Sequence, residues 1–243
     1  MSRAADDAAA GSDSGGARRQ SRFACPADRH AVRAESQGLQ GQAIRLEPLE
    51  LRHLDGLVAA AAADPSLYRW SLVPQGEVEV ARYIETALAW QDAGTAVPYA
   101  TVRAADGVVI GSTRFFNLEQ WPWPRGHRLH GRMEPDVCEI GYTWLAASQI
   151  RTAANTEAKL LMLTHAFEQW RVLGVCFHTD ARNQRSRAAL ERIGARLEGI
   201  LRAHRMAADY TPRDSAGYSI VAPEWPAAKQ RLVLLRERRY AGG

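Results

Sequence analysis

A short segment between Leu145 and Thr156 has the residue pattern of an anion-binding site. The apolar run 137–145 predicts a buried strand and the pattern over 152–170 predicts a helix, so this segment leads from a strand end into a helix. The first turn of a helix offers backbone N–H groups without partners and the positive end of the helix dipole. Phosphates are the anions best suited to such a site. We therefore expect a phosphate-bearing ligand at this helix start.

A second segment with unusual residue chemistry lies at 119–135, where two Trp-Pro pairs are followed by arginines and histidines. Two prolines exclude a central strand, so a loop between strands is predicted. This loop is either a flap whose Trp121 and Trp123 side chains stack on a ligand, or a surface loop held in place by those tryptophans. His127 and His130 have no third ligand nearby, so no metal site is predicted.

The elements that must position these residues form a unit from Val137 to Arg192. After the first strand and helix, a second strand is expected at 175–181 and a second helix begins at Asn183. A strand–helix–strand order favours a parallel strand pair with a right-handed crossover. Flanking patterns predict further strands at 43–47, 98–103, 108–118, 195–203 and 213–222, and helices at 49–63, 77–92 and from Pro226 onward.

Length and composition limit the domain number and the partners. The 243 residues suffice for one large domain or two small ones, and the formal net charge is +4. Such a mild basic excess suits an anionic ligand, whereas the sequence has no basic run of the kind that binds nucleic acid. Residues 1–41 contain almost no large apolar side chains, which predicts a disordered tail ahead of a domain at 42–243.

Cysteine usage and hydropathy indicate the compartment. Cys25, Cys138 and Cys176 lack metal-ligand spacing, and the last two lie in apolar strand runs, as small buried hydrophobes of a protein in a reducing compartment do. No stretch reaches the roughly 20 apolar residues of a membrane span, and the N-terminus lacks the apolar core of a secretory signal. A cytoplasmic protein without membrane contact is expected.

The order of elements and three short motifs together resemble the GNAT acyltransferase superfamily, most closely its RimJ/RimL-type N-acetyltransferase branch. The motifs are Thr156-Glu157-Ala158, Asn183-x-x-Ser186 and Ile193-Gly194-Ala195, and the resemblance covers about 42–239. It implies an α/β (α+β) fold in which helices flank a mixed, mostly antiparallel central sheet with one parallel, splayed pair of strands. The domain at 42–243 would then be a GNAT acyltransferase domain.

The resemblance also implies a site for acetyl-CoA, the cosubstrate of the family. Its pyrophosphate would lie on backbone N–H groups where the loop enters the helix, and its pantetheine arm would pair with the strand end at Trp144 and Leu145. Asn183 and Ser186 match positions that contact the pantetheine and the sulfur end, although Asn183 is equally well placed as a helix N-cap. The pyrophosphate-binding residues would be Arg151, Thr152, Ala153, Ala154, Asn155 and Thr156.

This chain departs from the family pattern in the same loop. Ile150 stands where the family has Gln or Arg, and Ala153 stands where it has Gly. Glycine lets the backbone approach the phosphates, so a Cβ at Ala153 is tolerated only if its φ is negative. Both changes favour a weakened cofactor site, an altered acyl preference or a site that has been lost.

Acyl transfer to an amine needs a base for the amine proton and an acid for the leaving thiolate. The resemblance assigns the base to Glu139, acting through water, and Ser186 is the candidate donor to the thiolate. The alternative for Glu139 is a structural carboxylate paired with an arginine of the 119–135 loop. Backbone N–H groups near Leu145 would polarise the thioester oxygen.

Two classes of function follow from these patterns. The first is an N-acetyltransferase that passes an acetyl group from acetyl-CoA directly to a primary amine, on a protein N-terminus or a small molecule, in a ternary complex. The second is a GNAT-fold binding or sensor module, and an enzyme that uses a longer acyl-CoA is a further alternative. A homodimer is compatible with the sequence, and direct nucleic acid binding is not expected.

Overall fold

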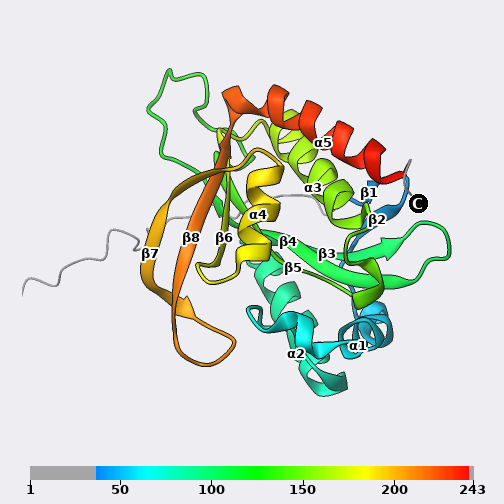
Figure 1. Cartoon of the computed structure of the whole chain (residues 1–243). Helices are drawn as coiled ribbons and strands as arrows, with labels where there is room; N and C mark the ends of the chain where they lie inside the picture. The colour runs from blue at the N-terminus through cyan, green and yellow to red at the C-terminus, as the bar shows by residue number, and fades with distance from the viewer. Residues whose placement is uncertain (1–36, 241–243) are drawn as a thin grey trace, which may run out of the picture. The chain divides into compact units, whose positions relative to one another are not determined.

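The computed structural model describes residues 37–240, which form one sheet with helices on both faces (Figure 1). The eight strands lie in the order β1-β2-β3-β4-β5-β6-β8-β7. All neighbours pair antiparallel except β5 and β6, which run parallel. The strands are β1 (Leu39–Gln40), β2 (Ile44–Pro48), β3 (Ala96–Arg103), β4 (Val109–Glu119), β5 (Val137–Leu145), β6 (Gly174–Asp180), β7 (Arg196–Met206) and β8 (Pro212–Val221).

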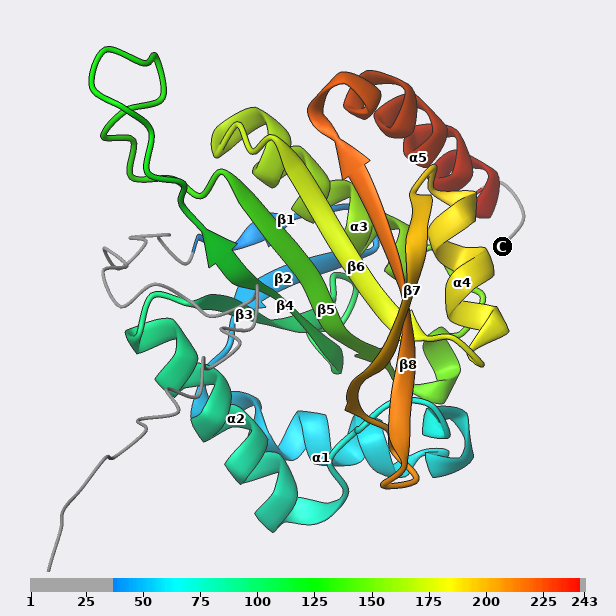
Figure 2. The ribbon, with the colours of Figure 1, turned by 90° about the vertical axis from the view of Figure 1, so that its left-hand side faces the viewer.

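The helices form two layers, one on each face of the sheet (Figure 2). On one face α1 (Leu54–Ala62) packs against α2 (Gly76–Asp92) over β3 and β4. On the other face lie α3 (Ala154–Thr164), α4 (Gln184–Arg192) and α5 (Trp225–Tyr240). Each layer buries its own apolar cluster, so the sheet separates two cores. This is the mixed α/β arrangement with a mostly antiparallel sheet that the sequence predicts.

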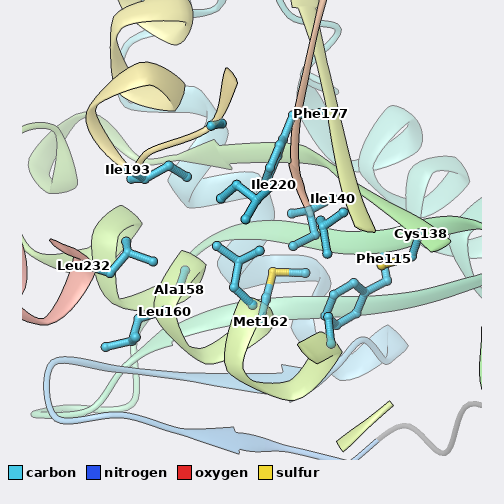
Figure 3. Close-up of a cluster of buried hydrophobic side chains, with 14 of the residues drawn as sticks. Phe115, Cys138, Ile140, Ala158, Leu160, Met162, Phe177, Ile193, Ile220 and Leu232 are labelled. Carbon is cyan, nitrogen blue, oxygen red and sulfur yellow. The ribbon is translucent and has the colours of Figure 1, made fainter. Parts of the chain in front are cut away.

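The core on the α3 side explains which way the side chains of β5 point. Cys138 and Ile140 belong to this core, together with Met162 of α3 and Phe177 of β6 (Figure 3). Because successive side chains of a strand point to opposite faces, Glu139 between them faces the α1–α2 side. Burial raises the pKa of both Cys138 and Cys176. Cys138 is buried in this core as expected, whereas Cys176 is only half-buried and lies outside it.

The parallel pair opens into a wedge. β5 and β6 pair only at Val137–Gly174, Cys138–Val175 and Glu139–Cys176. Beyond Glu139 each strand stays with its other neighbour, β5 with β4 as far as Leu145 and β6 with β8 as far as Asp180. The β4–β5 register shifts beside Tyr142, whose φ is 51°, and such a bulge bends and twists a strand. We call this opening the β5–β6 wedge; its apex is at Glu139.

The first described strand extends the domain toward the N-terminus. Leu39 and Gln40 pair with β2, so structure begins before Gln42, where it was expected. The rest of the predicted tail, with Cys25, lies outside the described residues. The buried Glu157 carboxylate of α3 accepts N–H groups of Gln42, Ala43 and Ile44 at 2.9, 2.7 and 2.9 Å. The Thr-Glu-Ala motif therefore joins the first sheet strands to α3.

The strand β7 differs from its sequence pattern in burial. Alternation over 195–203 suggests a buried apolar side, yet Leu197 and Leu201 are 47% and 38% exposed. The reason is position, because β7 is the edge strand and pairs only with β8. Sequence alternation identified the strand correctly but not its place in the sheet.

Candidate active site

The start of α3 has unpaired backbone donors, as the sequence predicts. Among the described residues, the N–H groups of Ala153, Asn155 and Thr156 have no hydrogen-bond partner. The N–H of Ala154 donates to Thr152 Oγ1 at 3.2 Å. Three free amides at the positive end of an 11-residue helix form a site suited to phosphate oxygens.

The conformation of this loop removes the objection raised by Ala153. Its φ is −71° and its ψ is −17°, a right-handed helical conformation in which a Cβ causes no strain. The turn requires a positive φ two residues earlier instead, at Arg151, where φ is 66°. The family glycine is therefore not needed for the backbone shape of this chain.

The open end of the wedge is fixed by the short turn η2 (Pro65–Tyr68). The Tyr68 hydroxyl donates to the carbonyl of Leu145 at 3.0 Å, and its ring meets the edge of Trp144. Trp144 is buried in the core on the α1–α2 side, so its indole is not available at the wedge. The side chains of Trp144 and Leu145 are both buried, so these residues can offer only main-chain groups to a ligand.

The N-terminus of α4 borders the other side of the wedge. Asn183 Oδ1 accepts the N–H of Ser186 at 3.0 Å, so Asn183 is the N-cap. Its Nδ2 has no partner among the described residues, which leaves that donor available to a ligand. Arg185 donates to the carbonyl of Leu67 at 3.0 Å. The turn η2 is therefore hydrogen-bonded both to the end of β5 and to the first turn of α4. The half-buried Ser186 lies within this frame.

The apex of the wedge has a buried cluster of polar groups around Glu139, which is 3% exposed. Its Oε2 accepts Asn117 Nδ2 at 2.9 Å and Arg205 Nη2 at 3.1 Å, and its Oε1 lies 2.9 Å from His178 Nδ1. The arginine expected from the 119–135 loop is therefore replaced by Arg205 of β7. Glu139 is ion-paired, but its partners come from three different strands.

A cavity of about 260 Å³ lies beside this cluster on the α1–α2 face of the sheet. Below its aromatic wall lies Arg114, which is 1% exposed, with its guanidinium carbon 4.3 Å from the Tyr142 ring and 4.6 Å from the Tyr83 ring. A buried positive charge next to the cavity favours the neutral form of an amine bound there. The cavity is lined by Trp90, Thr95, Phe116, Asn117, Tyr142 and Arg205.

A buried carboxylate, Asp136, fixes both tryptophans of the loop at 119–135. Asp136 accepts the N–H of Trp121 at 2.7 Å and the indole N–H of Trp123 at 3.0 Å, and Trp123 stacks on His127. The loop projects away from the sheet in both views (Figures 1 and 2) and no residue of it lines the cavity. Of the two alternatives, the structure favours the surface loop held by its tryptophans.

Several residues of this site were not singled out in the sequence. His178 and Arg205 join Glu139 only because β6 and β7 approach β5 in the sheet, and they lie 39 and 66 positions away in the chain. The sequence offered one local signal for His178. It lies two residues after Cys176 in the same predicted strand, so the two side chains are expected on the same face of the sheet. Nothing local indicates Arg205.

Within residues 37–240, no group of three or more His, Cys, Asp or Glu side chains could hold a metal ion. No helix in that part of the chain is both long and apolar enough to cross a membrane.

Comparison with known proteins agrees with the fold. A family model described as an acetyltransferase (GNAT) domain matches residues 43–196, so this chain belongs to the GNAT acetyltransferase family. No match was found among curated proteins.

Solved structures extend this likeness over most of the chain. A GCN5-related N-acetyltransferase from Brucella melitensis is 27% identical with a TM-score of 0.70, over 83% of this chain and 86% of that one. RimJ from Mycobacterium smegmatis, solved with CoA-disulfide, is 21% identical with a TM-score of 0.67, over 82% and 95%. An acetyl transferase from Salmonella typhimurium that modifies the N-terminal serine of ribosomal protein L7/L12 is 16% identical with a TM-score of 0.62, over 76% and 99%. The last two share the fold with this chain.

Proposed function

We propose that this protein transfers an acetyl group from acetyl-CoA to a primary amine, by direct attack while both substrates are bound. The observation that carries the proposal is the juxtaposition of an unpaired β5 edge with three unpartnered amides at the start of α3. The first can pair with an extended amide-containing arm, and the second suits a pyrophosphate. Acetyl-CoA has both groups in one molecule.

The residues present fit this cosubstrate. The loop 151–156 would hold the pyrophosphate through main-chain N–H groups, the strand end at Trp144 and Leu145 would hold the pantetheine arm, and Asn183 Nδ2 would donate to it. When bound, acetyl-CoA supplies the acetyl group as a reactive thioester. Ser186 is the proposed donor to the departing sulfur. Because Ala153 has a negative φ, we favour a working site over one that has been lost.

The amine would enter through the cavity on the α1–α2 face, while α3 lies on the opposite face of the sheet. Two substrates that approach from two faces can be bound together, as a ternary complex requires. Glu139 and the groups around it lie at the apex between them, where the amine proton must be accepted. A structural neighbour acts on an N-terminal serine, so a peptide N-terminus is our first proposal for the acceptor.

A charge change at the start of α3 tests the cosubstrate. Asn155→Asp places a negative charge in the first helical turn, which leaves the helix as stable or slightly more stable. The same charge repels a pyrophosphate, so we expect acetyl-CoA affinity to fall about tenfold or more by calorimetry. Asn155→Gln is the neutral control and should bind as the natural protein does. Saturable binding that Asn155→Asp does not weaken would place the ligand elsewhere.

A panel of amines tests the reaction. We would follow CoA release with a peptide that has a free N-terminal serine, an N-blocked lysine peptide and a small primary amine. Release that depends on one of these amines supports the enzyme. Tight acetyl-CoA binding without transfer to any of them would support the binding or sensor module, and faster turnover with a longer acyl-CoA would support the altered acyl preference.

A further inference from the structure

Both oxygens of the Glu139 carboxylate lie against polar side chains of neighbouring strands. Oε2 accepts hydrogen bonds from Asn117 and Arg205, and Oε1 faces His178. A carboxylate that takes a proton through water needs an oxygen that the water can reach, and Glu139 is 3% exposed. The cluster therefore presents Glu139 as a fixed negative charge beside an imidazole.

His178 is the member of the cluster with a free proton-accepting atom. Its Nδ1 is buried and lies 2.9 Å from Glu139 Oε1, which is ion-pair distance, although the two groups are not aligned as a hydrogen bond; the side chain is 18% exposed. Nε2 has no hydrogen-bond partner among the described residues, and it remains accessible to solvent. On β6, His178 follows Cys176, the last residue paired with β5, by two positions and shares its strand face. His178 therefore lies next to the apex of the β5–β6 wedge, on the same face of the sheet as the cavity.

We propose that His178 Nε2 accepts the proton of the acceptor amine, and that Glu139 is the positioning residue that holds the imidazole and stabilises its charged form. The inference rests on the proposed transferase function and changes the role predicted for Glu139. In the step, the amine nitrogen bonds to the acetyl carbonyl carbon, the carbon–sulfur bond breaks with its electron pair on sulfur, and the amine proton moves to Nε2. A carboxylate that orients a histidine base is a recurrent catalytic arrangement.

The surroundings of His178 are consistent with this assignment. Glu139 from β5 and the His204 ring from β7 lie beside His178, and Cys176 shares its strand face. Arg205 from β7 and Arg213 from β8 are the charged groups that act on His204 together with Glu139. Burial, then Arg205 and His178, lower the pKa of His204, which favours the neutral form of that ring beside His178. Glu139 is then the group that stabilises an imidazolium at His178.

The tautomer of His178 tests the geometry without any substrate. If Nδ1–H faces Glu139, the neutral ring has its free lone pair on Nε2. Nitrogen NMR of the full chain at about pH 8 should then show His178 protonated at Nδ1, a preference that Glu139→Gln weakens. A ring protonated at Nε2 would overturn the proposal whether or not the protein transfers acetyl groups, so this failure is distinct from failure of the proposed function.

Kinetics test the role. With the panel amine that releases most CoA, we expect His178→Gln to lower kcat/KM by on the order of a hundredfold and to remove the acid limb of the pH profile, with acetyl-CoA affinity unchanged. His204→Gln is the matched control, since it removes a neighbouring imidazole that forms no hydrogen bond or ion pair with Glu139 in the described part of the chain, and it should keep the limb. Adding Glu139→Gln to His178→Gln should lower kcat/KM little further, because the two residues act as a unit. An intact limb in His178→Gln, or a double variant that is slower by the product of the two single effects, would show that His178 is not the base.

Discussion

Replacing Lys159 should make this protein more stable. Lys159 lies on α3 inside the core and is 5% exposed, and its Nζ donates to Thr143 Oγ1 at 2.9 Å. Burial lowers the pKa of this lysine from 10.5 to about 7. Folding at neutral pH must therefore partly neutralise a group that is charged in the unfolded chain.

The size and sign of the effect follow from that shift. Between pH 7 and 10.5 the unfolded chain binds more protons than the folded one, so stability rises with pH across this window. The lowering of the Lys159 pKa from 10.5 to about 7 corresponds to roughly 4 kcal/mol at pH 7, and the lost hydrogen bond to Thr143 is worth about 1 kcal/mol. Lys159→Met should therefore gain about 3 kcal/mol in the free energy of unfolding at pH 6.5 and almost nothing at pH 9.5.

Urea unfolding of both proteins at pH 6.5, 8 and 9.5 measures this difference. Lys229, the only other lysine in the sequence, is 41% exposed as a side chain and provides the control, because Lys229→Met should show no such pH dependence. A Lys159→Met protein that is less stable than the natural one at pH 6.5, or a stability difference that does not change with pH, would refute the reasoning.

Three further predictions concern hydrogen bonds near the site. Glu157→Gln should cost about 3 kcal/mol of stability by urea unfolding, because an amide replaces a carboxylate that accepts three main-chain N–H groups; an equal midpoint would contradict this. Tyr68→Phe should cost about 1 kcal/mol and change acetyl-CoA affinity by calorimetry, since it frees the Leu145 carbonyl at the wedge; unchanged affinity would show that this carbonyl is not used. Asn183→Asp should keep the helix cap and stability but weaken acetyl-CoA binding, whereas Asn183→Ala should lose about 1 kcal/mol as well; equal binding by all three proteins would leave Asn183 a cap only.

Local patterns were sufficient for the elements themselves. Period-two alternation and an apolar run predicted β5 with the bounds that the structure has, and an Asn three residues before Ser186 predicted the start of α4. These features depend on neighbours along the chain, because strand alternation and helix capping are decided within a few residues. For the same reason the segment before α3 was predicted as an anion site from sequence alone.

What the sequence determined by itself is thus the order of elements, the start of α3 and the presence of Glu139 in a strand between two apolar residues. The tertiary structure decided where β5 and β6 separate, that Ala153 adopts a negative φ, and that His178 and Arg205 meet Glu139. Those outcomes come from strand pairing and bulges between residues far apart in the chain. Strand pairing across the whole sheet decides which of these residues meet, so no local pattern of the sequence can specify it.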